Sequence, residues 1–378
     1  MKRFAAALFV LLVHAQISQA SPILGYTQTN LVSNIPNLAA VLDPQLVNPW
    51  GISMTATSPF WIADNGSGVS TLYNSTGVKQ GLVVTIQPAG SGVPTGTVST
   101  AGAVAGSFNG DAFLFVTEDG RLEGWRGALG TTAENLSLPA SDVTSYKGLA
   151  LATFNNATYA YAANFTENKI DVFKGNSSFP ALTGNFTDPN LPAGYAPFNV
   201  QTLGNHIYVT YALLDPSSGD EVAGPGFGYV DEYDLNGVLT RRVVSAGVLN
   251  APWGITIAPA TWGPLANDFL IGNFGDGLIN VFSPAGALVG TLANAQGVLL
   301  QNNGLWALTF GNGGSGGSPN SLYLTAGLND EADGLFARID SPSLQAVPEP
   351  TSLSLIALGL AAWRGKRTFI SPASSRRS

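Results

Sequence analysis

The sequence predicts an all-β protein, a six-bladed β-propeller with four-stranded antiparallel blades. A thirteen-residue phrase occurs three times, as WIADNGSGVSTLY, YAANFTENKIDVF and LIGNFGDGLINVF at residues 61–73, 161–173 and 270–282. Short runs rich in β-branched and aromatic residues alternate with Gly, Asn, Asp and Pro, and no window keeps a helical apolar period. Self-similarity along a chain is the sequence signature of a repeat architecture.

Each repeat is expected to be a meander of four strands. Within the phrase, a strand ends at Asp or Asn, a Gly turn follows, and the next strand ends in an aromatic residue. A short strand comes before it, as in NPWGI (48–52) and APWGI (251–255). The expected blade starts are Trp50, Phe108, Gly148, Phe198, Trp253 and Trp306. Six such units suit a closed ring; a pair of β-sandwiches is the alternative, but it does not explain the repeated phrase.

Other segments have expected places in this ring. The segment LGYTQTNLV (24–32) is predicted to pair with the last blade, because an open ring would leave an unpaired edge. Residues 213–228 are expected as an insertion in blade four, and GNGGSGGSPN (311–320) as a flexible insert in blade six. Insertions in a propeller lie in loops on its faces.

The N-terminal segment predicts export. Residues 1–20 have a basic start, an apolar run and a small-residue end, which is the pattern of a cleaved signal peptide. The apolar run is shorter than the roughly 20 residues of a spanning helix. A buried N-terminal helix is the alternative. The propeller is expected over residues 24–341.

The C-terminal segment carries a second targeting pattern. Residues 347–367 read VPEPTSLSLIALGLAAWRGKR, a Pro-Glu-Pro, an apolar stretch and a basic cluster. The residues of the pattern are Pro348, Glu349, Pro350, Arg364, Lys366 and Arg367. This segment resembles the PEP-CTERM sorting signal of Gram-negative bacteria that make extracellular polysaccharide. The resemblance implies transient anchoring in the inner membrane, processing by an exosortase, and delivery to the cell surface or beyond.

Two features depart from that signal. The apolar run from Leu353 to Trp363 has roughly half the length of a spanning helix, and a short polar tail (368–378) follows the basic cluster. An ordinary hydrophobic tail is the alternative.

Composition narrows the possible partners. The net charge is −8, and seven of the 16 cations lie in the two terminal segments, so the part between them is strongly acidic. An acidic surface repels phosphate backbones, which argues against nucleic acid as a partner, and attracts divalent cations. The chain has no cysteine, so its stability depends on a packed core and not on disulfides.

The repeated segments also resemble a known fold family. NPWGI, WIADNGSG, APWGITIAP and GNFGDGLINVF resemble the NHL-type propellers. They are similar in particular to exported bacterial propellers that often end in PEP-CTERM. The resemblance covers about residues 24–341 and implies a fold and a destination, but no reaction.

Catalytic motifs are scarce. Without the N-terminal segment one histidine remains, His206, and we expect it to be a hydrogen-bonded residue beside a strand. No P-loop motif occurs, and one His without Cys does not make a zinc site. No catalytic residue is therefore assigned.

Oxygen ligands at the strand ends are the candidate binding residues. Asp64, Asn164 and Asn273 end equivalent strands in three blades and are expected to gather at one rim of the channel. Neighbouring acids and amides that can join them are Asn65, Glu118, Asp119, Glu167, Asp276, Asn329, Asp330 and Asp333. Such a set suits Ca²⁺, which takes six to eight oxygen ligands. The alternative is that these Asp and Asn residues bond their own backbone in turns.

Three tryptophans mark blade starts. Trp50, Trp253 and Trp306 are expected to wedge between blades, and carbohydrate stacking is the alternative.

Three functions remain open. The favoured one is an exported, non-catalytic scaffold that binds a protein or polysaccharide of the cell surface or matrix. The others are a calcium-assisted lactonase- or lyase-like enzyme and a structural matrix component.

Overall fold

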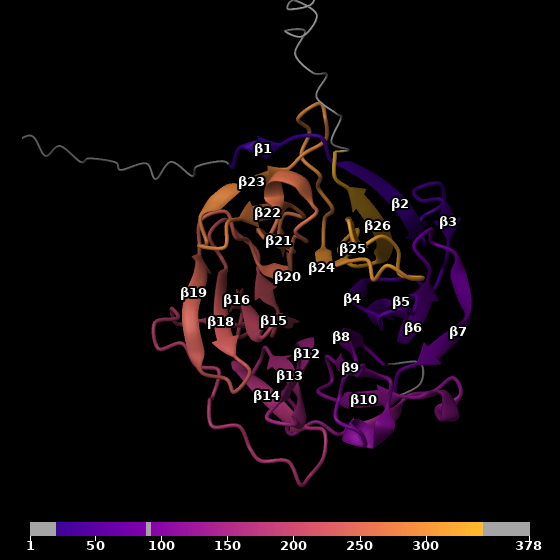
Figure 1. Cartoon of the computed structure of the whole chain (residues 1–378), viewed down its shortest axis with the longest axis vertical. Helices are drawn as coiled ribbons and strands as arrows, with labels where there is room; N and C mark the ends of the chain where they lie inside the picture. The colour runs from indigo at the N-terminus through magenta and orange to yellow at the C-terminus, as the bar shows by residue number, and fades with distance from the viewer. Residues whose placement is uncertain (1–19, 88–91, 343–378) are drawn as a thin grey trace, which may run out of the picture. The chain divides into compact units, whose positions relative to one another are not determined.

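The structure is a computed structural model that describes residues 20–87 and 92–342. The strands of these residues form six sheets arranged around a ring (Figure 1), which confirms the predicted six-bladed propeller. Helical structure within the described residues is limited to four short 3₁₀ turns: η1 (Asn65–Ser67), η2 (Ser107–Gly110), η3 (Gly127–Leu129) and η4 (Gly263–Leu265). None of the helices in this part of the chain is long and apolar enough to cross a membrane.

Blades one and two are regular four-stranded meanders. Blade one consists of β4 (Pro49–Ser53), β5 (Phe60–Asp64), β6 (Val69–Tyr73) and β7 (Lys79–Thr85). Blade two consists of β8 (Pro94–Ser99), β9 (Phe113–Thr117), β10 (Leu122–Trp125) and β11 (Glu134–Ser137). Their strands pair antiparallel in chain order, from the innermost strand outward.

Blade three has one strand fewer than this four-stranded plan, and blade four has one strand more. Blade three has three strands: β12 (Tyr146–Phe154), β13 (Ala157–Asn164) and β14 (Lys169–Lys174). Blade four has β15 (Tyr195–Leu203), β16 (His206–Leu214), β18 (Tyr229–Asp234) and β19 (Leu239–Ser245), with the short β17 (Glu221–Val222) also paired to β16. β17 belongs to the predicted insertion at 213–228, which extends blade four at one end.

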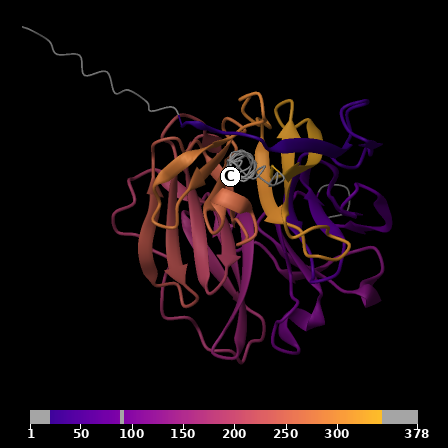
Figure 2. The ribbon, with the colours of Figure 1, turned by 45° about the horizontal axis from the view of Figure 1, so that its top comes forward.

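Blades five and six include strands from the N-terminal segment. Blade five has β20 (Pro252–Ile257), β21 (Phe269–Asn273), β22 (Ile279–Phe282) and β23 (Leu288–Leu292), with β1 (Pro22–Ile23) parallel to β23. Blade six has β24 (Leu305–Phe310), β25 (Ser321–Leu328), β26 (Asp333–Asp340), β2 (Thr27–Ser33) and β3 (Val41–Leu42). The antiparallel pairing of β2 with β26 closes the ring, as predicted for residues 24–32 (Figures 1 and 2). Closure leaves no unpaired edge between first and last blades.

The predicted start of blade two was wrong. Phe108 lies in η2, between β8 and β9, and the innermost strand of this blade is β8, which begins at Pro94. Pro94 and Thr95 take the place that Pro49 and Trp50 have in blade one. This start lacks the proline-aromatic pair that blades one, four and five have at Pro49–Trp50, Pro197–Phe198 and Pro252–Trp253.

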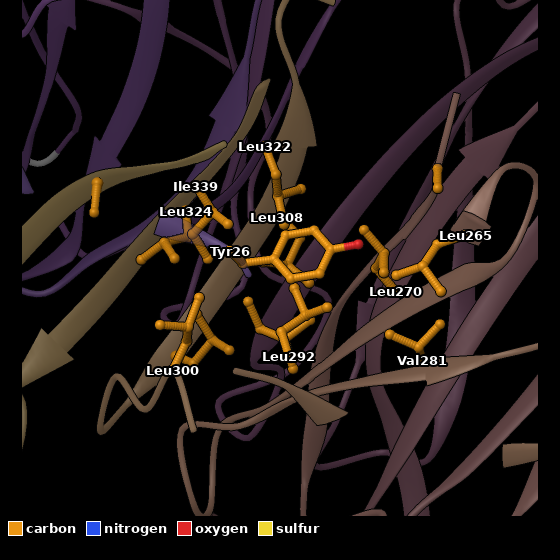
Figure 3. Close-up of a cluster of buried hydrophobic side chains, with 14 of the residues drawn as sticks. Tyr26, Leu265, Leu270, Val281, Leu292, Leu300, Leu308, Leu322, Leu324 and Ile339 are labelled. Carbon is orange, nitrogen blue, oxygen red and sulfur yellow. The ribbon is translucent and has the colours of Figure 1, made fainter. Parts of the chain in front are cut away.

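The core lies between neighbouring blades. Figure 3 shows the cluster between blades five and six, where Leu270 and Leu292 face Leu308 and Leu324 around the ring of Tyr26. The rings of Tyr26 and Trp262 are tilted by 45° relative to each other, with centroids 5.1 Å apart. Each fully buried aliphatic side chain stabilises the fold by about 1.5–3 kcal/mol relative to exposure. Since one sheet cannot cover both its faces, the blades stabilise one another.

Candidate binding site at one mouth of the channel

Each innermost strand begins with an irregular register against the second strand, at an equivalent position in all six blades. The residues at this position are Trp50, Thr95, Lys147, Phe198, Trp253 and Trp306, and all six are buried. A bulge re-aims the side chain that it carries. Six blades thus direct one side chain each toward a shared level of the channel.

Four of these side chains meet there and form what we call the aromatic plug: Trp50, Phe198, Trp253 and Trp306. The rings of Trp50 and Trp306 stack with centroids 3.5 Å apart and 18° between their planes. Trp253 meets both rings edge-on, and Phe198 from blade four lies 5.8 Å from Trp306. The predicted packing role of the three tryptophans is what the structure shows.

Glycine or alanine follows this position in five of the six inner strands and lets these strands approach closely. A Cβ added to Gly96 would lie 2.3 Å from the backbone nitrogen of Leu149, and one added to Gly254 would lie 2.4 Å from the carbonyl oxygen of Trp306. Only glycine permits so close a backbone approach. The channel is therefore narrow at the plug, and a cavity of about 20 Å³ lies beside these glycines.

On one side of the plug the channel widens into a cavity of about 840 Å³, which we call the acidic mouth. Its carboxylates are Glu118, Asp220, Glu221, Asp276, Asp330 and Glu331. Lys147 is the cation among its lining residues, and Trp50 and Phe274 supply aromatic faces. The carboxylates come from blades two, four, five and six, all on loops or on β17 just after a second strand. The turns that follow equivalent strands therefore do meet at one rim.

Lys147 is the charged member of the six equivalent positions. Its side chain is 4% exposed, and its Nζ lies 2.6 Å from Oε1 of Glu118 and 3.7 Å from Oδ1 of Asp220. The ammonium also lies over the ring of Trp50, 5.1 Å from the centroid. Burial lowers the pKa of Lys147, but the carboxylates of Glu118 and Glu221 outweigh burial and hold this pKa above its ordinary value. The ammonium is therefore charged at neutral pH.

Burial raises the pKa of three carboxyl groups of the mouth. Burial raises the pKa of Glu221 to about 7, against the opposing effect of the Lys147 ammonium. Burial likewise raises the pKa of Glu331 and of Asp276. Removing a carboxylate from water disfavours its charged form, and a positive ligand in this cavity would reverse that effect.

Hydrogen bonds connect the acidic mouth to the plug. Asn48 donates from Nδ2 to Oε2 of Glu331 (2.6 Å) and accepts at Oδ1 from Nε1 of Trp306 (3.0 Å). On the opposite side, Nε1 of Trp253 donates to the carbonyl of Lys147 (2.9 Å). Glu331 and Lys147 are thus positioned by the same residues that fill the channel.

Two of the three strand-end residues of the sequence prediction bond within their own blade, and Asn273 bonds to the connection between blades four and five. Asp64 accepts at Oδ2 from the backbone N–H (3.0 Å) and the hydroxyl (2.6 Å) of Thr71. Asn164 donates from Nδ2 to Glu167 and Asp171. Asn273 donates from Nδ2 to the carbonyl of Val248 (2.8 Å). These contacts are those of turn residues.

In the part of the chain that the structure describes, no group of three or more His, Asp or Glu side chains is placed to hold a metal ion. A calcium site at Asp64, Asn164 and Asn273 stays a prediction.

The other candidate residues differ in where they lie. Asp276 lines the acidic mouth, and Asn65 borders it by donating from Nδ2 to Oε2 of Glu118 (2.8 Å). Asp119 instead pairs with Arg121, at 2.7 Å. His206 is half exposed on β16, with Nδ1 3.2 Å from Oε1 of Glu232.

Sequence reasoning missed four of the mouth's charged residues: Lys147, Asp220, Glu221 and Glu331. The sequence does contain a signal for Lys147, because the lysine of YKGLAL aligns with the tryptophan of NPWGI. Glu331 directly follows Asp330 in the turn before β26. Asp220 and Glu221 lie in an insertion, where the repeat offers no alignment.

A family model for the PEP-CTERM protein-sorting motif matches residues 346–367. This match confirms the predicted sorting signal and indicates an exported protein. Residues 1–19 and 343–378 lie outside the described residues, as do the predicted signal peptide, the apolar run and the polar tail.

The relatives are viral proteins. Uncharacterized protein R648 of Acanthamoeba polyphaga mimivirus is 33% identical over 329 residues, which cover 82% of this chain and 78% of the relative. Uncharacterized protein L690 of the same virus is 32% identical over 329 residues, covering 82% of this chain and 84% of the relative. The expected membership of a bacterial exported family stays a prediction.

Solved structures share the fold at low sequence identity. A protein of unknown function from Bacteroides thetaiotaomicron superposes with a TM-score of 0.50 and 12% identity, over 84% of this chain and 76% of that protein. Virginiamycin B lyase from Staphylococcus aureus superposes with a TM-score of 0.49 and 13% identity, over 83% of this chain and 98% of the lyase.

Proposed function

This chain belongs to the family of the mimivirus proteins R648 and L690, and we propose that it is an exported propeller that acts as a non-catalytic binding scaffold at the cell surface or in the matrix. Its acidic mouth binds a positively charged group of a surface protein or polysaccharide. The observation that carries this proposal is the 840 Å³ cavity with six carboxylates and one ammonium in its lining.

The carboxylates of the acidic mouth favour a ligand that carries positive charge. Carboxylates in a concave site focus a negative potential and raise the local concentration of cations. The cavity lies in the size range of ordinary ligand pockets. The ring of Phe274 in the lining also favours a cation, since an ammonium or guanidinium is attracted to an aromatic face. The position of the Lys147 ammonium over Trp50 is an internal instance of that contact.

The sorting motif supports the location. A PEP-CTERM protein is a substrate for an exosortase-type enzyme, so that enzyme is the expected processing partner. In a Gram-negative bacterium the route would pass through transient anchoring in the inner membrane. Surface proteins and extracellular polysaccharide are then the ligands within reach.

Isothermal titration of the full chain tests the proposal. Tetralysine and a chitosan tetramer are the cationic probes, and tetraglutamate is the anionic comparison. We expect the double variant Asp330→Asn with Glu331→Gln to weaken binding of the cationic probes about tenfold. Asp142→Asn is the charge control, because Asp142 is exposed and lies outside the mouth. Equal affinity for tetraglutamate, or equal losses in both variants, would contradict the proposal.

One observation favours a second candidate, the calcium-assisted lactonase- or lyase-like enzyme. Glu221 has a pKa raised by burial to about 7, and a carboxyl that titrates near neutral pH in a cavity suits general acid–base catalysis. A melting curve with calcium and with chelator tests the metal part of this candidate. A tight site raises the midpoint through preferential binding to the folded state, and no shift at millimolar calcium would count against it.

A further inference from the structure

The channel has a second mouth on the other side of the aromatic plug. A cavity of about 440 Å³ lies there, at the ends of the innermost strands, and we call it the neutral mouth. Its polar side chains are those of Gln201 and of six hydroxyl residues: Ser53, Thr55, Thr97, Ser99, Thr202 and Thr309. We propose that the neutral mouth is a separate binding site for an uncharged, hydroxyl-rich ligand of the neutral-saccharide class.

The absence of charge in the lining sets the class of ligand. None of the described residues that line the neutral mouth is Asp, Glu, Lys, Arg or His. A charged ligand group would leave water there without a counter-charge, at a cost of several kcal/mol. A neutral ligand has no such cost, provided that its polar groups find partners in the cavity. This site therefore selects against the ligands that suit the acidic mouth.

Gln201 offers an unsatisfied amide at the base of the cavity. It lines both the neutral mouth and the small cavity beside the plug, so it lies where the channel narrows. Its backbone pairs with Tyr208 in the sheet. Within the described part of the chain its half-buried side-chain amide has no hydrogen-bond partner. An amide carries two donors and two acceptor positions, and a ligand hydroxyl can use either kind.

The hydroxyl groups around the rim present both donors and acceptors. Oγ1 of Thr55 accepts the backbone N–H of Ser58 (3.1 Å), which leaves its own O–H free to donate. Oγ1 of Thr202 donates to the carbonyl of Leu151 (2.9 Å), which leaves its lone pairs free to accept. Each hydroxyl of a saccharide is itself a donor and an acceptor. Mixed polarity of this kind matches a polyol better than a ligand with donors alone.

Aliphatic side chains separate these polar groups. Ile52, Met54, Val98 and Leu151 line the same cavity. The carbon-bound hydrogens of a sugar ring form apolar faces, which such side chains can cover. A volume of about 440 Å³ lies within the range of about 300–1,000 Å³ for ligand pockets.

The glycine-rich insert of blade six holds part of the rim in place. Nδ2 of Asn312 donates to the carbonyls of Thr55 and Ser58, at 2.8 Å each, and its Oδ1 accepts the backbone N–H of Gly314 (2.9 Å). The insert was expected to be flexible, but these bonds fasten it to the turn that carries Thr55. A rim ordered before binding loses less entropy when ligand arrives.

The test is a glycan array followed by titration calorimetry with the full chain. The array carries neutral glucan, galactan and mannan oligosaccharides, oligogalacturonate as the anionic probe and chitosan oligomers as the cationic probe. We expect a neutral oligosaccharide to bind, and Gln201→Leu to weaken that binding about tenfold. Thr202→Val, which keeps the shape of the side chain, should weaken it about threefold. Circular dichroism establishes that each variant is folded.

A matched control separates this site from the acidic mouth. The double variant Asp330→Asn with Glu331→Gln should leave neutral-saccharide binding unchanged, because both residues lie on the other side of the plug. Three results would overturn the inference: no neutral oligosaccharide binds at millimolar concentration, the charged probes bind at the neutral mouth equally well, or folded Gln201→Leu and Thr202→Val both bind like the parent chain.

Discussion

The two mouths lie on the two sides of the aromatic plug, and they are built from different parts of the chain. The acidic mouth takes its charged side chains mainly from loops, and only Trp50 and Lys147 in its lining come from innermost strands. The neutral mouth takes most of its lining from the strands themselves, including Thr97 on β8 and Gln201 on β15. One scaffold thus carries a loop-built surface at one end and a strand-built surface at the other.

This difference bears on how each end can change. Loops tolerate insertions and substitutions, so a mouth made of loops can acquire charge without altering the sheet. The insertion that carries Asp220 and Glu221 is such a case. A mouth made of strand residues is constrained by the sheet, and sites on rigid elements hold their geometry more closely. The acidic mouth is therefore the adaptable end, and the neutral mouth the fixed one.

The largest expected effect is on the free energy of unfolding, when a substitution disrupts the aromatic plug that separates the two mouths. Trp306 is fully buried in the plug, so Trp306→Ala should reduce the free energy of unfolding by about 3–5 kcal/mol. It also removes the hydrogen bond from Nε1 to Asn48, which positions Glu331. Urea denaturation measures the loss.

Trp125→Ala is the matched control, because Trp125 is only half-buried on β10, away from the plug. We expect a smaller loss there, about 1–2 kcal/mol. Similar losses in the two variants would show that the plug does not hold the ring together.

The sequence was sufficient for the blades because strand patterns are local. The phrase that ends in Tyr73 and returns at Phe282 marks two strands and the turn between them, and β5–β6 and β21–β22 form those pairs. The prediction for blade two failed at Phe108 because its true first strand, PTGTVS, has three β-branched residues but no aromatic residue after its proline. A strand held by its neighbours needs little pattern of its own.

The site was harder to predict because the same oxygen chemistry serves turns and ligands. Asp64 could have been a ligand or a turn residue by type, and only its bonds to Thr71 distinguish the two. Asp276 lies within a repeated phrase and lines the acidic mouth, whereas Glu221 comes from an insertion with no counterpart in other blades. Which loops converge depends on their lengths and conformations, and these are not repeated.

An effect of intermediate size is expected in the pH dependence of the free energy of unfolding, which should involve the acidic mouth and not the neutral mouth. Burial raises the pKa of Glu221 from 4.5 to about 7, so between these values the folded state binds more protons than the unfolded state. The contribution of Glu221 to the stability of the parent chain therefore falls as pH rises from 4.5 to 7. Glu221→Gln cannot titrate, and we expect it to be more stable than the parent by about 1–2 kcal/mol at pH 8, with no difference at pH 4.

Thermal melting across this pH range measures the difference, with Asp142→Asn as the control for removing an exposed carboxyl group. Gln201→Leu at the neutral mouth should also follow the parent at every pH, since no titratable residue of the described chain lines that cavity. A variant Glu221→Gln that stays parallel to the parent from pH 4 to pH 8 would contradict the assignment.

The smallest expected effect is the coupling between the two ends, and its size sharpens the comparison most. Gln201 and Glu221 belong to the same blade, opposite Tyr208 and Leu214 of β16. Six residues of extended strand place these positions about 20 Å apart. Substitutions that far apart without shared partners add within about 0.5 kcal/mol. The double variant Gln201→Leu with Glu221→Gln should therefore change the free energy of unfolding by the sum of the single changes. Repeating this double-mutant cycle in the Trp306→Ala background tests whether the plug keeps the two mouths independent. If the changes are no longer additive in that background, the plug separates the mouths. A coupling above about 1 kcal/mol in the parent chain would mean that the two mouths form one site.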